Sequence, residues 1–363
     1  MSLLMKRRNT MSTNGLDEVL ERFAAIAKGT HVPGPTERFS SYAVSNFRGG
    51  IGKTTLTFNL SFEVSRQRST LLLDLCPQRS FSEFLLGDDV NHAGPTVYDA
   101  LLPKVMPGTD EPDYQELLHR VSVTCPSFKG GKVCSLVTGA KELFLFPSSF
   151  YNALNQVASL PDAKKVKQGS NRILSALADV IAEIKTTTKA SKTIIDTSPF
   201  FGGGTHLAWS AVEALIIPVR VDQQSIDALE LTLDMLTNPT MDFIRLNERA
   251  GRTSVPKVHA IALTHCGWAR QKEYTPDQST QAFISKVLDI AHENADLFSA
   301  PNPADCIFLM DDFHSAGRIS GNKRIPLSSL EIGKFFTIEG MRLQVNDSLE
   351  RYVNEVRALA NIL

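Results

Sequence analysis

Residues 48–55 carry the residue types that grip a nucleoside triphosphate, in the order Arg48, Gly49, Gly50, Ile51, Gly52, Lys53, Thr54 and Thr55. Glycines let backbone N–H groups turn inward and approach phosphate oxygens closely. A helix that begins near Lys53 adds its free N–H groups and the positive end of its dipole. Lys53 would then reach the β and γ phosphates, and the Thr54 hydroxyl would hold Mg²⁺.

The segment departs from the strict phosphate-loop pattern G-x-x-x-x-G-K-S/T, which asks for a glycine five residues before Gly52. Phe47 occupies that position, so two adjacent glycines followed by Gly-Lys-Thr form a compressed variant. The alternative is a glycine-rich turn that binds no ligand. A second Gly-Gly-Lys segment at 130–132 has neither a following Ser or Thr nor a following helix, and it is interpreted as a turn.

The flanking segments have the pattern of a parallel α/β sheet. Residues 40–46 indicate a short strand that leads into the loop, and the apolar spacing over 53–67 indicates a helix. Continuous apolar runs, typical of buried parallel strands, follow at 70–74, 192–196 and 214–219.

The first two of these runs end in a carboxylate, Asp74 and Asp196 respectively. Ligands of α/β proteins bind at the carboxyl ends of the strands. We therefore expect both carboxylates beside the loop, where they would organise Mg²⁺ and its waters. Two acid-tipped strands in this order argue against a ligand-free turn.

These features resemble the ParA branch of the ParA/MinD family, the deviant Walker A ATPases. The resemblance rests on the compressed loop and on the segments 74–78 and 194–199, and it covers residues 41–363, weakly over 103–140 and 237–320. It implies a doubly wound, mostly parallel α/β sheet of the P-loop NTPase type. It also implies an ATPase that forms a homodimer around ATP and Mg²⁺, with Lys53, Asp74, Asp196 and Arg48 as catalytic residues.

The same resemblance implies a role in chromosome or plasmid partition, or in the positioning of another large cargo. Many members of the family bind DNA without sequence preference in the ATP state, and a partner protein, here a ParB-like protein or a cargo adaptor, triggers hydrolysis. We therefore expect a cytoplasmic protein that associates with the nucleoid.

Two residues depart from the family pattern. Arg48 stands where the signature lysine crosses the dimer interface, and arginine keeps the charge but differs in reach and geometry. Cys76 stands where the family has a second aspartate that helps to place the attacking water, and a thiol with an ordinary pKa is mostly neutral at pH 7. We expect slow hydrolysis; the alternatives are that Asp74 or a water takes over, or that the protein is a nucleotide-locked scaffold with little turnover.

Charge, cysteine spacing and hydropathy exclude several classes of protein. The chain has 363 residues and a net charge of −1, which excludes a uniformly basic DNA-coating protein, so any DNA contact must use a local patch. The five cysteines have no C-x-x-C or metal-like spacing, which fits a reducing compartment. No apolar run approaches the about 18 residues that span a bilayer, and no signal peptide is recognised, so no membrane contact is expected.

Two other enzyme classes fit poorly. A reductase of the nitrogenase iron-protein type would need a cysteine in the stretch just after Asp196 to bridge a cluster, and no cysteine lies near that stretch. A bacterial tyrosine kinase of the related type would need a C-terminal tyrosine cluster, and Tyr352 stands alone.

Outside the core we expect an N-terminal extension, 1–40, with one amphipathic helix at 16–28 and a linker, before an ATPase domain at 41–363. The helix is expected to dock on the protein's own surface, with a partner-binding peptide as the alternative. Residues 103–140 indicate a surface excursion with one helix at 114–121. The apolar stripe of residues 346–363 indicates a C-terminal helix that packs on the core.

A cluster of arginines is the candidate DNA contact. Arg245, Arg249 and Arg252 would share a helix face if 239–250 is helical, and Lys257, Arg270 and Lys272 follow along the chain. The alternative is a solvated face. No aromatic residues are interleaved, so phosphate contact is the expected mode.

Overall fold

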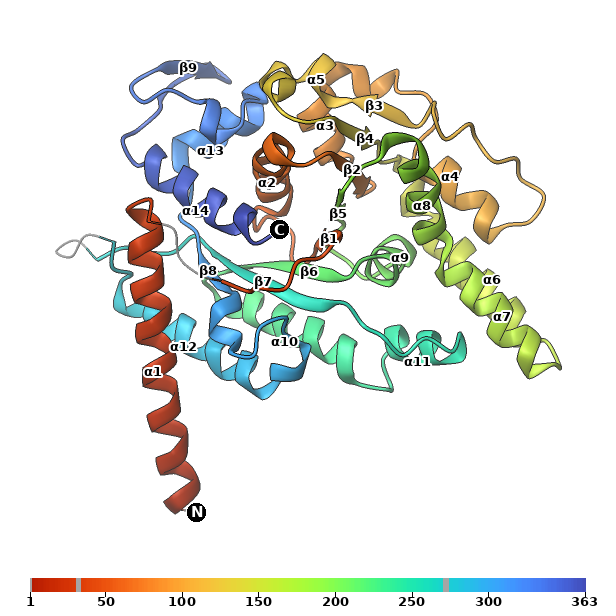
Figure 1. Cartoon of the computed structure of the whole chain (residues 1–363), viewed down its shortest axis with the longest axis horizontal. Coiled ribbons are helices and arrows are strands. Elements are labelled where there is room, and N and C mark those ends of the chain that lie inside the picture. The colour runs from red at the N-terminus through yellow and green to blue at the C-terminus, as the bar shows by residue number, and fades with distance from the viewer. Residues whose placement is uncertain (1, 31–33, 270–273) are drawn as a thin grey trace. The chain divides into compact units, whose positions relative to one another are not determined.

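The computed structural model describes residues 2–30, 34–269 and 274–363. Its strands are β1 Ser41–Val44, β2 Thr70–Leu75, β3 Leu118–Arg120, β4 Cys134–Val137, β5 Lys192–Thr197, β6 Ala214–Arg220, β7 Lys257–Thr264, β8 Ile307–Leu309, β9 Phe335–Ile338 and β10 Met341–Gln344. Its helices are α1 Ser2–Ala27, α2 Lys53–Gln67, α3 Ser80–Leu86, α4 Val97–Val105, α5 Val121–Thr124, α6 Phe146–Ala158, α7 Ala163–Leu174, α8 Ala176–Thr188, α9 Gly203–Ala211, α10 Gln223–Thr237, α11 Asp242–Arg249, α12 Gln278–Glu293, α13 His314–Lys323 and α14 Leu349–Asn361 (Figure 1).

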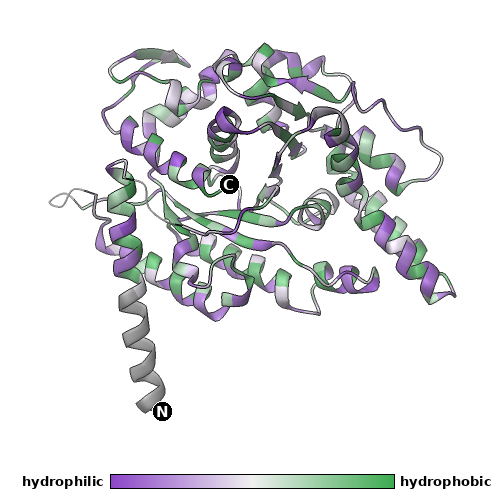
Figure 2. Cartoon of the chain, in the orientation of Figure 1, coloured by the Kyte–Doolittle hydropathy of each residue, from purple (hydrophilic) through white to green (hydrophobic). Residues whose placement is uncertain are grey.

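A mostly parallel sheet with flanking helices confirms the predicted doubly wound α/β fold. Its strand order is β3-β4-β2-β5-β1-β6-β7-β8, and β9 pairs with β10 separately. Figure 2 shows hydrophobic residues along the strands and mixed hydrophobic and hydrophilic residues on the helices. No helix within the described residues combines the length and the apolar character that crossing a membrane requires.

The chain divides into two compact units, and the one formed by Phe39–Leu215 and Leu231–Pro256 contains the predicted phosphate loop. In this unit β5 pairs in parallel with both β1 and β2. Helix α2 lies on one side of these strands and α8 and α9 on the other (Figure 1). Apart from Lys192 at the start of β5, the residues of these three strands are buried, as continuous apolar runs predict.

The excursion predicted at 103–140 is partly wrong. Residues 118–120, expected in a helix, form β3, which pairs antiparallel with β4. Strand β4 is buried between β3 and β2 and belongs to the core. Pairing with β4 decides the conformation of 118–120, because strand formation depends more on packing against neighbours than on local preference.

The other unit comprises Met1–Arg38, Ile216–Glu230 and Lys257–Leu363. Its helix α1 extends beyond the predicted 16–28 and packs against α12 and α14, with Phe23 stacked on Trp268 at a ring-centroid distance of 4.9 Å. The amphipathic helix therefore docks on this unit's own surface. Helix α14 buries Tyr352 and Val356, which confirms the predicted core-packing helix.

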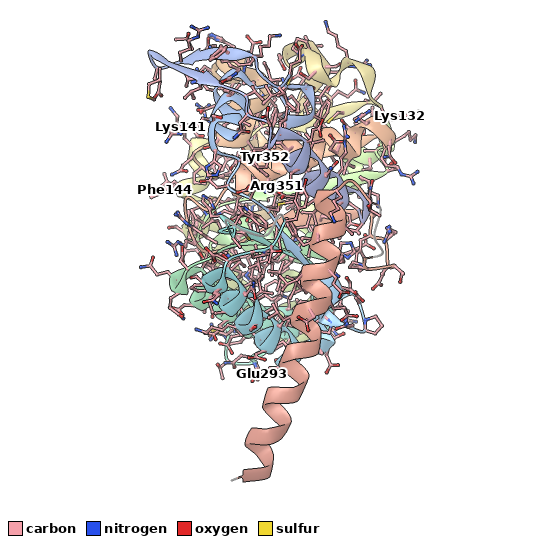
Figure 3. All side chains as sticks on the ribbon, turned by 90° about the vertical axis from the view of Figure 1, so that its left-hand side faces the viewer. Lys132, Lys141, Phe144, Glu293, Arg351 and Tyr352 are labelled. Atoms are coloured by element: carbon pink, nitrogen blue, oxygen red, sulfur yellow. The ribbon has the colours of Figure 1, made fainter. Side chains whose placement is uncertain are left out.

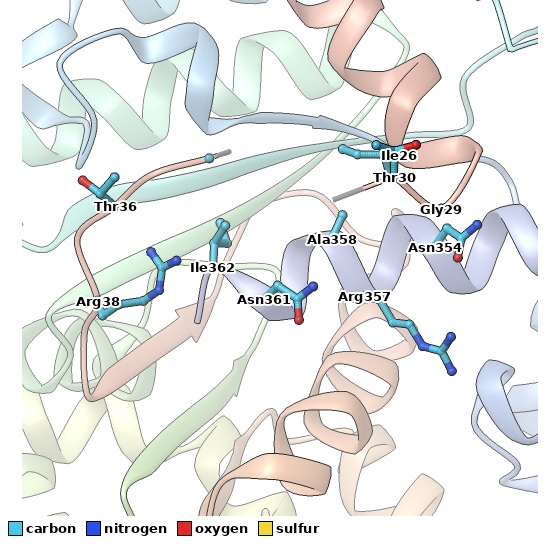
Figure 4. A pocket seen from close by; sticks show the side chains of 11 residues that line it. Ile26, Gly29, Thr30, Thr36, Arg38, Asn354, Arg357, Ala358, Asn361 and Ile362 are labelled. Atoms are coloured by element: carbon cyan, nitrogen blue, oxygen red, sulfur yellow. The ribbon is translucent and has the colours of Figure 1, made fainter. Parts of the chain in front are cut away.

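A pocket of about 330 Å³ lies between the end of α1, residues 34–38 and α14 (Figure 4). Arg38, Asn354 and Asn361 are among its polar side chains, and Ile26 and Ile362 are among its apolar ones. None of the residues predicted to bind phosphate or metal lines this pocket.

Candidate functional site

The loop between β1 and α2 leaves open space above its glycines. Gly50 and Gly52 have φ angles of +71° and +86°, a left-handed conformation that glycine adopts without steric cost. A Cβ built at Gly49, Gly50 or Gly52 would meet no atom within 4 Å. Helix α2 begins directly after Gly52 with no side-chain cap, so its first N–H groups are suited to an anion in that space.

Phe47 anchors the start of the loop. Its ring packs against Phe201 at 6.0 Å and against Trp209 of α9 at 5.6 Å, both between ring centroids. Trp209 Nε1 also donates to Ser45 Oγ at 2.9 Å. The residue that breaks the strict pattern thus fastens the compressed loop to α9, a role that the sequence reasoning missed.

Lys53 is enclosed by the loop. The residue is 7% exposed, and its Nζ donates to the Arg48 carbonyl oxygen at 2.6 Å. Burial lowers the pKa of Lys53, while Asp196 acts in the opposite direction. The loop therefore contains a single buried lysine beside its open space, where a phosphate would meet it.

The Asp196 carboxylate forms hydrogen bonds with hydroxyl groups from the first turns of α2. Thr54 Oγ1 donates to Oδ2 at 2.9 Å, and Thr57 Oγ1 lies 2.8 Å from Oδ1. Burial, and secondly Asp74, raise the pKa of Asp196 to about 7. Thr54 and Asp196 place oxygen atoms side by side, as a Mg²⁺ site requires. Thr57 was missed, although a hydroxyl one turn after Thr54 could have indicated it.

Asp74 lies opposite Asp196 in the register of β2 and β5. Its Oδ1 accepts the Cys76 N–H at 2.9 Å, and its Oδ2 accepts Ser82 N at 2.9 Å and Ser82 Oγ at 2.8 Å. Burial raises the pKa of Asp74 to about 6. The structure thus brings the two predicted carboxyl groups together, and Asp74 ties the end of β2 to α3.

The two residues that depart from the family pattern both lie at this edge. Arg48 is half-buried, and its backbone N–H donates to Asn46 Oδ1 at 2.9 Å. Cys76 is 6% exposed, and burial, together with the charge of Asp74, raises its pKa to about 12. The thiol is therefore neutral at pH 7, as predicted.

An apolar surface adjoins Cys76. A pocket of about 460 Å³ is lined by Cys76, Pro77, Gln78, Lys141, Phe144, Pro199 and Phe200. Phe144 and its neighbour Leu145 are 70% and 69% exposed. Figure 3 shows Phe144 and Lys141 at the outer margin of the view. Large apolar side chains gathered at one exposed place indicate an interaction surface.

The residues present fit a nucleotide with Mg²⁺ better than a metal held by protein alone. In the described parts of the chain, no group of three or more His, Cys, Asp or Glu side chains could hold a metal ion. Mg²⁺ usually takes one or two protein ligands and completes its shell with phosphate oxygens and water. Thr54 and Asp196 could supply the protein ligands, and the space above Gly49, Gly50 and Gly52 could take the phosphates.

The second Gly-Gly-Lys segment differs from this loop, because Gly131 is closely packed although Gly130 has open space around it. A Cβ at Gly131 would lie 2.7 Å from the Ser65 carbonyl oxygen, and Lys132 N donates to that same oxygen at 2.7 Å. This glycine therefore serves close packing against the end of α2. The segment is a turn, as predicted.

The predicted arginine face is only partly formed. Helix α11 ends at Arg249, and Gly251 follows with a φ angle of +74°. Arg252 lies beyond the helix, and its Nη2 donates to the Ser210 carbonyl oxygen at 2.8 Å, so the prediction that it shares this face is wrong. Arg245 forms an ion pair with Asp242. Arg270 and Lys272 lie outside the described residues.

Comparisons with known proteins agree with this geometry. The AAA domain family matches residues 40–243. The chromosome partitioning protein ParA of Myxococcus xanthus is 30% identical over 187 residues, which make up 51% of this chain and 54% of that protein. The chain thus spans about half the length of this curated relative.

Two solved structures of McdA from Cyanothece share the fold. A complex of a McdA variant with ATP has a TM-score of 0.59 at 17% identity, over 89% of this chain and 97% of that chain. Apo McdA has a TM-score of 0.57 at 17% identity, over 88% of this chain and 99% of that chain.

The raised pKa of Asp196 predicts a pH-dependent stability. Its pKa is about 7 in the folded chain against an ordinary 3.8. Between these values the folded chain holds a proton that the unfolded chain has released, so stability falls as the pH rises from about 4 to about 7. Asp196→Asn should lose less stability over this range, measured by urea unfolding. Equal pH slopes in variant and wild type would contradict the raised pKa.

Proposed function

This chain belongs to the ParA/MinD family of ATPases, and from that premise we propose that it is a ParA-like partition or positioning ATPase that dimerises around ATP and Mg²⁺. The observation that carries the proposal is the open glycine loop with Lys53 buried at its side. A ligand-free turn gains nothing from a buried ammonium group, whose desolvation is unfavourable.

Each site residue has a proposed role. The backbone N–H groups of Gly49, Gly50, Ile51 and Gly52 would face the phosphates, as would those of Thr54 and Thr55 at the start of α2. Lys53 would bind the β and γ phosphates, and Thr54 and Asp196 would hold Mg²⁺. Asp74 would reach the metal only through water, because Cys76 and Ser82 already donate to its oxygens.

Dimerisation is supported by the apolar surface beside Cys76. The exposed residues Phe144 and Leu145 follow β4, and the adjoining pocket includes Cys76, which follows β2. They would therefore lie at the edge of the sheet where the nucleotide is proposed to bind. A second copy that covers this edge would bury them, at a gain of about 25 cal/mol per Å² of apolar surface. Arg48 would then bind the partner's phosphates.

The same proposal includes the cellular context of the family. The relative that is named as a chromosome partitioning protein supports a chromosome as cargo. The proposal extends, from the family resemblance alone, to a plasmid as cargo, a ParB-like or cargo-adaptor partner, DNA as the matrix and a cytoplasmic, nucleoid-associated location. Arg245 and Arg249 of α11 remain DNA candidates.

A second candidate function is a nucleotide-locked dimer that acts as a static scaffold. The observation that favours it is the neutral Cys76 thiol, which offers no carboxylate to an attacking water. The two candidates share the ATP site and differ in turnover.

Lys53→Ala should abolish ATP-dependent dimerisation, because a charge-assisted contact to phosphate is lost. The matched control is Lys132→Ala, which removes the exposed lysine of the other Gly-Gly-Lys segment. Calorimetry should show at least about tenfold weaker ATP binding for Lys53→Ala, since such a bond contributes about 1.5–3 kcal/mol. Unchanged ATP affinity in Lys53→Ala would show that the loop is not the phosphate site.

Arg48→Ala should leave nucleotide binding by the monomer nearly intact and weaken the ATP-bound dimer. Arg48→Lys, which restores a cation, should recover part of the dimer. Sedimentation with a non-hydrolysable ATP analogue measures both variants. A dimer of wild-type strength in Arg48→Ala would mean that the arginine does not act across the interface.

Cys76→Asp should raise kcat for ATP hydrolysis while KM changes less, because it restores an acceptor for the attacking water. The gain is bounded by the ~10²–10⁴-fold typical of one proton-handling group. Cys76→Asn, of similar size but neutral, should stay near the wild-type rate in a multiple-turnover phosphate-release assay, run with and without DNA. The prediction is contradicted if the Cys76→Asp variant is folded and still dimerises but has a kcat equal to or lower than that of the wild type. Cys76 would then not limit hydrolysis.

A further inference from the structure

The pocket beside Cys76 lies at the carboxyl ends of three strands. Its lining residues follow β2, β4 and β5 in the chain, and they are Cys76, Pro77 and Gln78, then Lys141 and Phe144, then Pro199 and Phe200. The Asp74 carboxylate accepts the Cys76 N–H at 2.9 Å. Asp74 is also the register partner of Asp196, which accepts the Thr54 hydroxyl at 2.9 Å. Under the proposed function, the pocket therefore adjoins the place of the γ-phosphate.

This pocket offers no carboxylate to an attacking water. No described residue that lines it is acidic, and Cys76 contributes a thiol. The Asp74 carboxylate nearby is already engaged, because Cys76 N, Ser82 N and Ser82 Oγ donate to it. If the protein hydrolyses ATP, other side chains have to place the water.

Gln78 presents its amide from a tight turn. The Arg79 N–H donates to the Cys76 carbonyl oxygen at 2.9 Å, which closes a four-residue turn with Gln78 in its third position. Because Asp74 holds the Cys76 N–H, the start of this turn is tied to the carboxyl pair. Gln78 is exposed, and its side chain forms no hydrogen bond with any described residue. Its amide is therefore available to a water molecule in the pocket.

Lys141 brings a cation to the same pocket. It begins the short 3₁₀ helix Lys141–Phe144 after β4. The loop before it packs closely on the carboxyl pair, since a Cβ at Gly139 would lie 3.0 Å from Asp74 Cγ and Gly139 N donates to Ser82 Oγ at 3.0 Å. Lys141 is exposed and forms no ion pair with a carboxylate of the described chain. Its charge is therefore available to a phosphate group.

We propose that Gln78 positions the attacking water in this pocket, and that Lys141 stabilises the negative charge of the γ-phosphate. The inference rests on the proposed function, for which it names the residues that sustain hydrolysis without a carboxylate at position 76. A primary amide suits this task, because its oxygen accepts a hydrogen bond from water while its NH₂ group donates to a phosphate oxygen. Phosphoryl transfer depends mainly on positioning and electrostatic stabilisation, so an amide and a cation can support it.

The reaction balances without a carboxylate base. The water oxygen forms a bond to the γ-phosphorus, and the bond from that phosphorus to the β–γ bridging oxygen breaks, so that its electron pair stays on ADP. One water proton passes to an oxygen of the transferred phosphate group. ATP⁴⁻ and water thus give ADP³⁻ and H₂PO₄⁻. Gln78 orients the water for this attack, and Lys141 attracts the phosphate oxygens.

The walls of the pocket suit a few held waters. Pro77, Phe144, Pro199 and Phe200 make most of its side-chain lining apolar. In the proposed dimer, a second copy over Phe144 would close the pocket and separate these waters from bulk solvent. Gln78 and Lys141 would then act in a water-poor site, where hydrogen bonds and charges have stronger effects.

The test measures multiple-turnover phosphate release at saturating ATP and Mg²⁺ by Gln78→Ala and Lys141→Ala. The matched controls are Gln115→Ala and Lys132→Ala, which remove an exposed glutamine and an exposed lysine of the same unit. Lys141→Arg keeps the cation. Thermal unfolding shows whether each variant is folded, and calorimetry and sedimentation give its ATP binding and its ATP-dependent dimerisation.

We expect Gln78→Ala and Lys141→Ala each to lower kcat at least about tenfold with KM nearly unchanged, because each removes an interaction that is made in the transition state. Lys141→Arg should recover most of the lost kcat. Both controls should turn over like the wild type.

A double variant distinguishes water positioning from a merely structural role of Gln78. In Cys76→Asp the restored carboxylate can hold the water, so adding Gln78→Ala should lower kcat by less than about threefold. A structural role would give the same fold loss in the wild-type and Cys76→Asp backgrounds.

Four results would overturn the inference: wild-type kcat in Gln78→Ala, wild-type kcat in Lys141→Ala, an equal loss in the controls, or an equal loss from Gln78→Ala in the Cys76→Asp background. Absence of turnover in a wild type that binds ATP and dimerises would overturn it too, and would leave the static scaffold as the function. Absence of ATP binding by the wild type, in contrast, would refute the proposed function itself.

Discussion

Two carboxyl groups are buried side by side at the carboxyl ends of β2 and β5, and they constrain how α2, α3 and the glycine loop are placed around them. Asp74 and Asp196 are register partners with no exposed surface, and a buried carboxyl group without donors would cost several kcal/mol. Helix α2 supplies hydroxyl groups to Asp196 through Thr54 and Thr57, and α3 supplies the donors to Asp74 through Ser82. Because Thr54 and Thr57 must reach Asp196, the start of α2 is fixed, and the orientation of the glycine loop before it is fixed as well.

The same constraint explains how one residue can change the chemistry while the surrounding backbone stays in place. Asp74 holds the Cys76 N–H, so the segment after β2 is built from the backbone and does not depend on the side chain at 76. Burial keeps the thiol neutral, and the apolar pocket with Phe144 and Phe200 adjoins it. Under the proposed function, binding and turnover would be separable in this site: the loop and the carboxyl pair would serve nucleotide binding, and the side chain at position 76 would affect only the attacking water.

Much of this arrangement follows from local sequence. Apolar runs ending in Asp74 and Asp196 predict parallel strands with ligands at their carboxyl ends, and α2 spans the predicted 53–67. Long-range contacts were not predictable: residues 118–120 are a strand only because β4 lies beside them, and the roles of Ser82 and Thr57 depend on which strand end they meet.

The most direct test of the account is calorimetric titration of the wild-type chain with ATP and with AMP, each in the presence of Mg²⁺. Under the proposed function, Lys53 and the loop contact the β and γ phosphates, which AMP lacks. The account predicts one ATP per chain and an affinity for AMP at least about 100-fold weaker, a difference of about 2.7 kcal/mol. Equal affinities for ATP and AMP, or no binding of ATP at all, would contradict it.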